Sequence, residues 1–575
     1  MNKFNKSELL LAILFVLSIP TYGNQFNWAK GFGDTGHEAG NIILNDKQGN
    51  IILGGYFRGK VNFNDSVAPK FLTSKGSEDI FINKYNASGQ LIWALGFGGK
   101  GPDRCNNAVI DKDGNIYLVG NFRDTVDFNS NSNPRVSAGF NDVFITKISA
   151  QGQLLWSRQF GGPLDEMGRS ITITNDDQVI ITGTFQGTAV FAETNNVLTA
   201  LKNADIFIAN YNSNGELMWA KQVGGLAEDI AYSVSVGKNN QIYITGTYNS
   251  DVDFDPGVGV FRLLQQGVWP NMFVLGLNVT GDFQWVKSIV GDNLIIPYNL
   301  KVDQLGELVI TGTFRSTVDF DPDVNQKLLT TSSQYGDAFV LKLYQTGEFK
   351  WVKQLGGELN EIGLGLEIDE LNNIYTTGCY QNNADFDPGV GEYIIHTRGN
   401  SSNNDIYISK LNSDGEFVWV STMNGLSEDI GFSICVQASN LVYTTGIFSD
   451  ELNVNPGPDS IFIQSNGFTD IFIHSYRQVT SDVKELGDNN IINIYPNPIK
   501  NYLTVEYEVD DFEKTKISII PISSIELAEM SFTISSIKGR NIFVFPTDNI
   551  LTGGLYILQL TSGGKKSNRK FIVTK

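Results

Sequence analysis

The sequence contains few cysteines and histidines, whose thiol and imidazole groups form many catalytic and metal-binding sites. It contains three cysteines and three histidines in 575 residues. The cysteines are too few for a disulfide framework, and their spacing matches no zinc pattern. The histidines stand at unrelated positions, and no Gly-x-Ser-x-Gly segment supports a Ser–His–Asp site. We therefore expect no catalytic centre based on cysteine or histidine.

Positive charge is also scarce. The formal net charge is −20, which repels phosphate backbones, and there is no basic run with interleaved aromatic residues. Nucleic acid is therefore excluded as a partner. Charged residues make up only 18% of the chain, while 59 residues are glycine and 11% are aromatic. This composition is typical of a turn-rich, all-β protein.

Long apolar runs are absent except at the start of the chain. Residues 1–23 open with Lys3 and Lys6, continue with an apolar run at 9–19 and end in small residues before Asn24. The run is too short to span a bilayer, and the pattern is that of an export signal. No later segment is apolar enough to cross a membrane. We expect an exported protein whose mature chain has no transmembrane segment.

Most of the remaining chain consists of one sequence stretch that is repeated seven times. Its tryptophans recur at nearly equal intervals along the chain: Trp28, Trp93, Trp156, Trp219, Trp285, Trp351 and Trp419. A glycine follows each of them at one constant interval: Gly55, Gly120, Gly183, Gly246, Gly312, Gly378 and Gly446. A third anchor precedes the next tryptophan, again at a constant interval: Asp79, Asp142, Asp205, Asn271, Asp337 and Asp405, with Asp470 in the last copy. Such fixed offsets indicate a repeat architecture.

Each copy predicts four short strands, here called A to D. In the copy after Trp219 they cover 231–237, 241–248, 271–278 and 282–289, joined by tight turns within the A–B and C–D pairs. Seven four-stranded units without helical periodicity predict a seven-bladed β-propeller over residues 24–478. The repeats open with a lone strand D and stop after a strand C. We therefore expect the N-terminal strand to complete the last blade and close the ring.

Length variation is confined to the B–C connections, which share a face with the D–A crossovers in a propeller. Binding residues concentrate on loops held by a rigid scaffold, so this face is the expected ligand face. The crossovers share an acid at a fixed interval after the tryptophan: Glu38, Asp103, Glu166, Asp229, Glu361 and Asp429. These carboxylates either fix the crossover by accepting backbone N–H groups or hold a cationic ligand near the axis. Trp269, in one variable loop, is either a sugar-stacking platform or loop packing.

A second group of acids opens three B–C loops with the pattern Asp-Phe-Asp-Pro. The pairs are Asp253 and Asp255, Asp319 and Asp321, and Asp385 and Asp387. Residues i and i+2 of an extended segment point to one side, so each pair is a candidate site for a hard cation such as calcium. Alternatively the aspartates cap the turn while the phenylalanine fills the gap between blades. Calcium is the only cofactor that the sequence suggests.

The character of the chain changes after a linker at 479–489. Residues 490–575 alternate apolar and polar positions in several short runs, which predicts a small Ig-like β-sandwich. Its start, Tyr495-Pro496-Asn497-Pro498, its Gly554-Leu555-Tyr556 segment and its end, Lys570 to Val573, resemble the C-terminal sorting domain of the type IX secretion pathway of Bacteroidetes. The repeats are similar to bacterial β-propeller repeats found in front of such tails.

The resemblance implies a cellular localisation rather than a biochemical activity. It implies contact with the secretion machinery, passage across the outer membrane, and attachment at the cell surface or release. Our first hypothesis is a non-enzymatic surface or secreted binding protein for a glycan or protein ligand, with calcium as a candidate helper. The alternatives are a carbohydrate-active hydrolase or lyase that uses two loop carboxylates, and a structural envelope protein.

Overall fold

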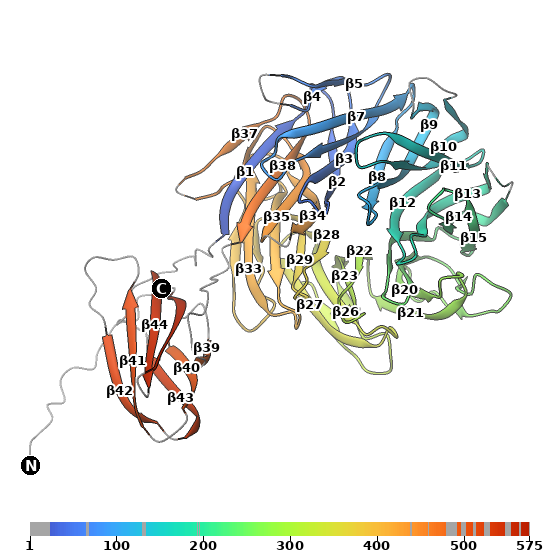
Figure 1. Cartoon of the computed structure of the whole chain (residues 1–575). Helices are drawn as coiled ribbons and strands as arrows, with labels where there is room; N and C mark the ends of the chain where they lie inside the picture. Colours follow the sequence, from blue (N-terminus) through green and yellow to red (C-terminus); the bar gives the residue numbers. More distant parts are fainter. Residues whose placement is uncertain are drawn as a thin grey trace, which may run out of the picture. The chain divides into compact units, whose positions relative to one another are not determined.

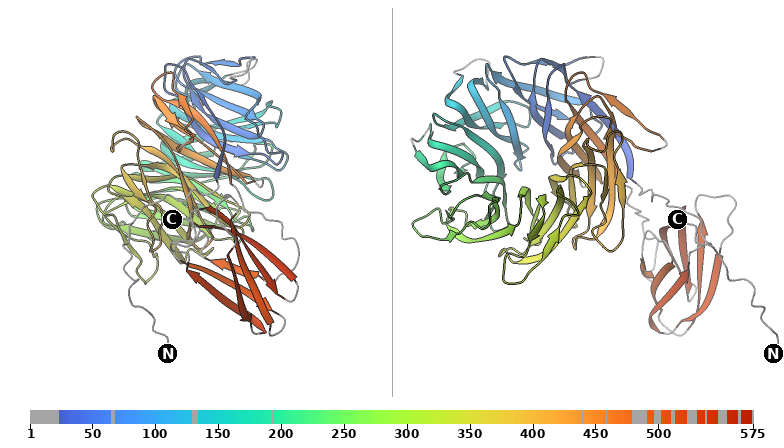
Figure 2. Two further views of the ribbon diagram at one scale, coloured as in Figure 1. Left: turned by 90° about the vertical axis from the view of Figure 1, so that its left-hand side faces the viewer. Right: turned by 180° about the vertical axis from the view of Figure 1, so that it is seen from behind.

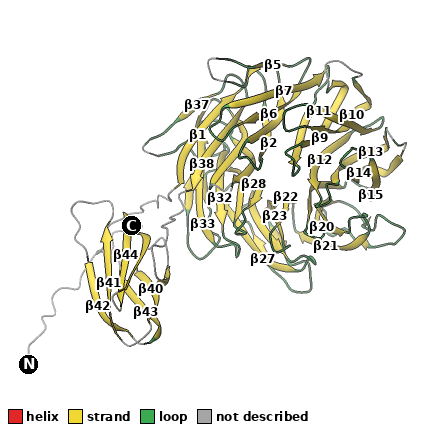
Figure 3. Ribbon diagram, in the orientation of Figure 1, coloured by secondary structure: helices red, strands yellow, loops and turns green. Residues whose placement is uncertain are grey.

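The computed structural model shows an all-β protein built from antiparallel sheets. It describes residues 24–64, 68–128, 134–192, 194, 196–437, 440–457 and 459–478, and, towards the C-terminus, 491–495, 502–509, 513–521, 530–536, 538–546, 554–562 and 565–573. Within these ranges there are strands, turns and loops but no helix (Figure 3), and so none that could span a membrane. The predicted export signal at 1–23 and linker at 479–489 lie outside the described residues.

The repeat predicted around Trp219 is present as four antiparallel strands. They are β16 (Ile230–Val236), β17 (Ile242–Tyr248), β20 (Asn271–Leu277) and β21 (Phe283–Gly291), paired in that order. Each boundary lies within two residues of the sequence prediction. The turn residues set these limits because the tight A–B and C–D hairpins need residues with a positive φ angle, such as Asn240 and Gly281.

The other copies repeat this pattern. The remaining A strands are β2 (Ala39–Asn45), β8 (Arg104–Ile110), β12 (Glu166–Ile173), β22 (Ile295–Val302), β28 (Glu361–Ile368) and β34 (Ile430–Gln437). The B strands are β3 (Ile51–Phe57), β9 (Ile116–Asp127), β13 (Val179–Phe191), β23 (Leu308–Arg315), β29 (Ile374–Tyr380) and β35 (Leu441–Phe448). The C strands are β6 (Asp79–Tyr85), β10 (Arg135–Ile148), β14 (Asn196–Tyr211), β26 (Gly336–Leu343), β32 (Asp405–Leu411) and β38 (Asp470–Gln478). The D strands are β1 (Asn24–Phe32), β7 (Leu91–Gly99), β11 (Leu154–Gly161), β15 (Leu217–Val223), β27 (Phe349–Gly357) and β33 (Phe417–Gly425).

The A strands form the inner wall of a ring. Each contacts the A strand of the next copy, in the order β2, β8, β12, β16, β22, β28, β34, and β34 contacts β2 again. Figures 1 and 2 show the copies following one another around a central axis. Serines tie neighbouring inner strands together, since Ser170 Oγ accepts the Val234 N–H at 3.1 Å and Ser233 Oγ accepts that of Leu300 at 3.1 Å.

The two ends of the repeat region meet in one sheet. Strand β1 lies next to β38 in the order β1-β38-β35-β34, as the sequence predicted, and the Asn27 side chain donates to Ser475 Oγ at 3.1 Å. The first strand of the chain thus completes the last copy. This pairing covers an edge that would otherwise expose unpaired backbone groups.

The B–C connections are more ordered than the sequence predicted. Five contain a short extra hairpin: β4 (Lys60–Asn62) with β5 (Phe71–Thr73), β18 (Val252–Asp253) with β19 (Arg262–Leu263), β24 (Thr317–Asp319) with β25 (Leu328–Thr330), β30 (Asn383–Asp385) with β31 (Ile394–His396), and β36 (Glu451–Asn453) with β37 (Phe462–Gln464). Three of these hairpins also pair with strand D of the preceding copy, as where Gly291 faces Val318. They therefore connect neighbouring copies as well as forming loops. Strands of two or three residues are too short for an alternation pattern to reveal.

The strand-B glycines stand where the backbone of strand A comes closest. A Cβ added to any of the seven would meet a strand-A carbonyl oxygen far inside the 3.0 Å that real Cβ atoms keep, as at Gly246 against Ile230. The approach coincides with a β-bulge in strand A, where the register with β17 shifts between Ala231 and Ser233. Glycine is thus required by the bulge, because only a residue without a Cβ permits so close an approach of the two strands.

The repeated tryptophans wedge between copies. Trp219 Nε1 donates to the Val279 carbonyl at 3.2 Å, in the C–D turn of the next copy, and its ring lies 3.0 Å from where a Cβ of Gly281 would be. Trp28, Trp93 and Trp156 donate to the equivalent turns at 3.1 to 3.3 Å. The tryptophan therefore joins one copy to the next, and the turn glycine makes room for its ring.

The C-terminal strands form two sheets with one apolar core. The first sheet contains β39 (Ile491–Tyr495), β40 (Tyr502–Val509) and β43 (Gly539–Pro546). The second contains β41 (Glu513–Pro521), β42 (Met530–Ser536), β44 (Gly554–Ser562) and β45 (Lys565–Val573). Leu503, Ile517 and Leu558 are among the buried side chains. Residues 26–477 make up one compact unit, and the C-terminal strands belong to a second.

Candidate functional site

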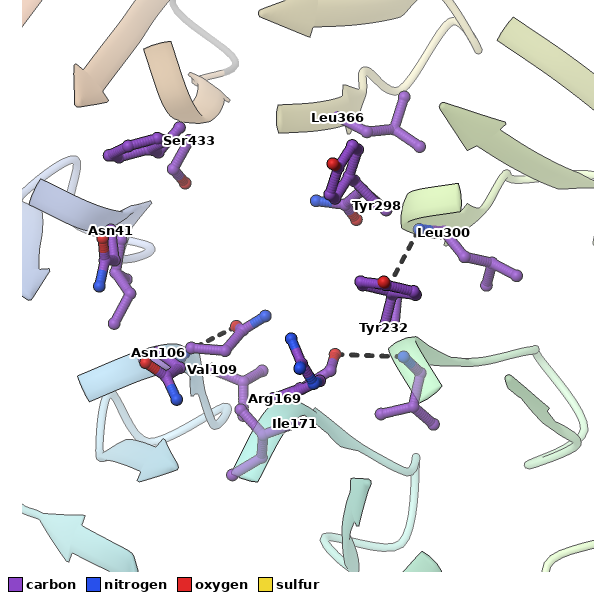
Figure 4. Close-up of a pocket in the computed structure, with 18 of the residues that line it drawn as sticks. Asn41, Asn106, Val109, Arg169, Ile171, Tyr232, Tyr298, Leu300, Leu366 and Ser433 are labelled. Carbon is purple, nitrogen blue, oxygen red and sulfur yellow. Dashed lines mark hydrogen bonds between the residues drawn. The ribbon is translucent and has the colours of Figure 1, made fainter. Parts of the chain in front are cut away.

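The inner strands enclose a pocket on the axis of the ring. It has a volume of about 400 Å³ and is lined by residues from the A strands of all seven copies (Figure 4). One half-buried residue from the bulge of each strand takes part: Asn41, Asn106, Arg169, Tyr232, Tyr298, Leu364 and Phe432. We call this cavity the axial pocket and these seven the bulge residues.

The bulge residues differ from copy to copy although the scaffold repeats. Each follows its tryptophan at the same interval in the chain, and they run from asparagine and arginine through tyrosine to leucine and phenylalanine. The β-bulge turns a single residue of each inner strand away from the regular alternation. The sequence pattern did not predict this site. The signal was a variable position between fixed anchors, but only the bulge shows that it faces the axis.

One side of the axial pocket is polar. The Asn106 amide donates to the Gly168 carbonyl at 2.8 Å and to Asn121 Oδ1 at 3.0 Å, and the Asn41 amide donates to the Cys105 carbonyl at 3.0 Å. Beside them, Nε of Arg169 is buried and has no hydrogen-bond partner among the described residues. Burial lowers the pKa of Arg169 from its ordinary value, yet an arginine in a protein stays protonated. This wall therefore carries a fixed positive charge.

The adjacent wall is aromatic and apolar. The Arg169 guanidinium lies over the Tyr232 ring at 5.3 Å, and Tyr232 meets Tyr298 edge to face, with ring centroids 5.7 Å apart. Burial raises the pKa of Tyr298 to about 12, so its hydroxyl stays protonated at neutral pH. Leu364 and Phe432 follow around the ring. The axial pocket thus changes from polar to apolar around its circumference.

Two further charged residues line the axial pocket, and they neutralise each other. Lys301 Nζ lies 3.2 Å from Glu367 Oε2, between neighbouring inner strands. Of the described residues that line the pocket, Glu367 is the only carboxylate and Arg169 the only cation without a carboxylate within ion-pair distance.

The crossover acids lie inside the protein rather than on an exposed face. All six are fully buried: Glu38, Asp103, Glu166, Asp229, Glu361 and Asp429. Each accepts a backbone N–H next to the crossover, as Asp229 does from Gly225 at 2.7 Å and from Asn249 at 3.1 Å. None lines the axial pocket. Of the two roles left open by the sequence, this geometry favours the structural one.

Each crossover acid is coupled electrostatically to a buried strand-C aspartate. The six pairs are Glu38 with Asp470, Asp103 with Asp79, Glu166 with Asp142, Asp229 with Asp205, Glu361 with Asp337, and Asp429 with Asp405. Burial, reinforced by Asp79, raises the pKa of Asp103 to about 8, and burial raises that of Asp79 to about 6. Oδ1 of both residues is buried without a hydrogen-bond partner among the described residues.

One junction lacks both carboxylates. There Asn271 replaces the strand-C aspartate and Ile295 replaces the crossover acid, and both side chains are buried. With its amide flipped, Asn271 donates to the Gln266 carbonyl at 3.0 Å and accepts the Gln266 N–H at 2.9 Å. An amide at this position thus makes both bonds, while a carboxylate needs a proton to donate. That both acids are absent together indicates that they act as a pair.

The Asp-Phe-Asp-Pro aspartates accept hydrogen bonds within their own loops. Oδ1 of Asp319 accepts the N–H groups of Asp321 at 3.2 Å and of Lys327 at 2.8 Å. Asp253 and Asp385 accept the equivalent pairs, and Asp255, Asp321 and Asp387 accept the N–H two residues on. The intervening Phe254, Phe320 and Phe386 are fully buried. No group of three or more metal-ligating side chains occurs among the described residues.

Asparagine performs the same loop-capping role in other copies. Oδ1 of Asn62 accepts the N–H groups of Asn64 at 3.2 Å and of Lys70 at 2.9 Å. We therefore expect Asp319→Asn to change the free energy of unfolding by less than about 0.5 kcal/mol, as for surface substitutions that keep their contacts. Thermal melts with calcium and with EDTA would measure it. A calcium-dependent rise in the wild-type melting temperature that the variant loses would instead establish a calcium site.

Of the remaining sequence candidates, Trp269 does not line the axial pocket. Trp269 is 44% exposed in the loop after β19, and its role as a stacking platform stays a prediction. In the C-terminal strands, Tyr495 ends β39 and Gly554 begins β44, while Tyr556 is buried in the core. The motif residues Pro496, Asn497 and Pro498 lie outside the described residues.

Comparison with known proteins agrees with the repeat and with the tail. The chain is 21% identical over 434 residues to an uncharacterized WD repeat-containing protein, L264, of Acanthamoeba polyphaga mimivirus, which covers 61% of this chain and 31% of that protein. It is 28% identical over 158 residues to the regulatory protein FlaEY of Caulobacter vibrioides, over 26% of this chain and 17% of that one. The chain thus spans less than a third of either relative's length.

Among solved structures, the extracellular domain of the hybrid two-component system BT4673 of B. thetaiotaomicron aligns over 95% of this chain and 99% of that chain. The identity is 11% and the TM-score 0.16, which is too low to carry an argument about the fold. The tail is more specific. Residues 493–574 match the family described as the secretion system C-terminal sorting domain, as their motifs predicted. This match indicates delivery by the type IX pathway to the cell surface or the extracellular space. The C-terminal strands of this all-β repeat chain therefore belong to the family of secretion system C-terminal sorting domains.

Proposed function

We propose that this protein is an exported binding protein in which a seven-bladed β-propeller holds a ligand in its axial pocket. In this proposal an Ig-like β-sandwich at the C-terminus engages the secretion machinery, and the strand order β1-β38-β35-β34 closes the propeller. The ligand is a glycan or a protein segment outside the cell. Closed contacts among the seven inner strands support the propeller assignment.

The observation that carries the binding role is the asymmetry of the axial pocket. The scaffold repeats closely enough that the strand-B glycine is kept in all seven copies, whereas the bulge residues change in chemistry around the axis. Repeated residues are explained by the repeated fold, but a repeated fold does not require seven bulge residues of such different kinds. A concave pocket with a few convergent polar groups beside an aromatic wall is typical of ligand sites.

The same pocket argues for binding rather than glycoside hydrolysis. Glycosidases place two carboxyl groups on either side of the scissile bond. Of the described residues that line the axial pocket, Glu367 alone is a carboxylate, and it is paired with Lys301.

The proposal is tested by presenting the purified protein to an array of polysaccharides and extracellular-matrix proteins, in calcium and in EDTA. We expect retention on a subset of spots without degradation of the bound material. A variant with Tyr232→Ala and Tyr298→Ala should lose this retention while its circular dichroism spectrum remains that of the folded protein. Degraded spots would favour the hydrolase, and a blank array in both buffers would favour a structural envelope protein. Retention lost only in EDTA would add calcium to the binding face.

A further inference from the structure

Arg169 is the charge in the axial pocket that the fold does not explain. Its Nε is buried without a partner among the described residues, and no described carboxylate forms an ion pair with it. The carboxylate that acts electrostatically on Arg169 is Glu228, which is exposed. Leaving a buried donor unmatched costs roughly 1–3 kcal/mol, more when it is charged. The stacking of the guanidinium on the Tyr232 ring contributes stabilisation, but it leaves the Nε–H without an acceptor in the described part of the chain.

The scaffold does not require arginine at this position. The equivalent bulges hold asparagine at Asn41 and Asn106, tyrosine at Tyr232 and Tyr298, and apolar residues at Leu364 and Phe432. All of these form the same bulge beside the same glycine. A cation that the fold neither needs nor neutralises points to a negatively charged group supplied from outside.

The rest of the pocket limits what carries that negative charge. Lys301 and Glu367 cancel, so the lining has a net charge of one positive unit, whereas the whole chain carries −20. Anions are thus repelled by the net charge of the molecule and attracted by the positive charge of this pocket. A guanidinium holds a carboxylate with two parallel hydrogen bonds.

Two neighbouring features suit a sugar ring. Tyr232 and Tyr298 offer an aromatic wall directly beside the guanidinium, and aromatic rings pack against flat apolar faces. Opposite them, the amide N–H groups of Asn41 and Asn106 are engaged with the protein. Their amide oxygens accept no hydrogen bond from the described residues, so they remain available to ligand hydroxyl groups.

We propose that the axial pocket selects a sugar residue that carries a carboxylate, such as a uronic acid, with the carboxylate on Arg169 and the ring against Tyr232 and Tyr298. This inference rests on the proposed binding function and specifies its ligand. The volume of about 400 Å³ lies within the usual range for small-ligand sites. The same chemistry is offered by a free acidic monosaccharide and by the end of an acidic polysaccharide.

The test compares galacturonate with galactose by isothermal titration, and digalacturonate with both, on the full chain. We expect galacturonate to bind about 10- to 100-fold more tightly than galactose, as for a hydrogen bond to a charged group. Arg169→Asn installs the residue that Asn106 already places in the neighbouring bulge, so the variant should fold. It should bind both sugars equally. Arg104→Asn removes an exposed arginine outside the axial pocket and should leave the preference intact.

Each outcome bears on the proposal. Tighter binding of digalacturonate than galacturonate would support a polysaccharide end as the source, and equal binding would support the monosaccharide. Equal affinity of the wild type for galacturonate and galactose would overturn the inference, as would a preference that survives Arg169→Asn. If no sugar binds but the array yields a protein ligand, the acidic-sugar assignment is wrong while the binding function stands. If the array is blank as well, both fail.

Discussion

Replacing Gly246 by alanine should destabilise the repeat ring by about 3 kcal/mol or more, which is the upper end of the usual cost of overpacking. An added methyl group at this site would collide with the Ile230 carbonyl oxygen in the adjacent strand. Backbone atoms cannot turn aside as a flexible side chain can. Either β16 must move away from β17 or the bulge between Ala231 and Ser233 must be lost.

The same substitution should also disturb the axial pocket, because the bulge at this point directs Tyr232 towards the axis. Thermal melting followed by circular dichroism measures the loss of stability, and titration with the ligand found on the array measures the loss of the site. Gly96→Ala is the matched control. It also lies in a strand, β7, but its added Cβ would find ordinary contacts at 3.6 Å. A Gly246→Ala protein that melts like the Gly96→Ala protein would contradict the role given to the bulge.

Much of the ring could be predicted from the sequence because its anchors have strict packing roles. The interval from Trp219 to Gly246 is constant since the tryptophan meets the next copy's turn and the glycine meets the strand-A carbonyl. Neither contact tolerates a shift of one residue, so the constant spacing also determines where the strands begin and end. The pairing of β1 with β38 followed from the same register, since a lone strand D and a missing strand D complete one another.

The axial pocket could not be predicted in this way. From strict alternation along the strand, a residue such as Arg169 would be assigned to an outward-facing position. Only the β-bulge turns its side chain towards the axis. The sequence instead drew attention to repeated acids such as Asp229, because a repeated residue is easy to see. The repeat marks what the fold needs, and Asp229 is buried in the crossover. Function in a repeat protein is more readily sought where the copies differ.

The buried carboxyl pairs should make the protein less stable as the pH rises from about 4.5 to 8. In the folded state the pKa of Asp103 is about 8, of Glu166 about 8, and of Asp229 and Asp405 about 7, against 3.8 to 4.5 in an unfolded chain. The folded protein therefore holds protons that the unfolded chain has released. Their stabilisation is complete below the unfolded values and is lost as the pH passes through the folded ones.

Other groups act in the opposite direction but are fewer. Burial lowers the pKa of His474 to about 3, which favours the folded state above pH 6.5 and withdraws that benefit as the pH falls. One histidine is opposed by at least seven carboxyl groups whose pKa values lie at about 7 or higher or are raised well above normal. Each uncompensated proton changes the free energy of unfolding by about 1.4 kcal/mol per pH unit. The carboxyl groups therefore determine the direction of the pH dependence, and the free energy of unfolding falls as the pH rises.

Melting temperatures at pH 5.5 and pH 8 measure the effect, and the wild type should melt several degrees lower at pH 8. Asp205→Asn with Asp229→Asn removes one pair of carboxyl groups, as Asn271 and Ile295 together do naturally at their junction. The double variant should show a weaker dependence of the melting temperature on pH, whatever its absolute melting temperature. Asp414→Asn, in an exposed C–D turn, should leave the slope unchanged. A wild-type melting temperature that rises between pH 5.5 and pH 8 would show that these carboxyl groups are ionised in the folded protein. In that case their unpartnered oxygens would have to be satisfied by a bound cation rather than by a shared proton.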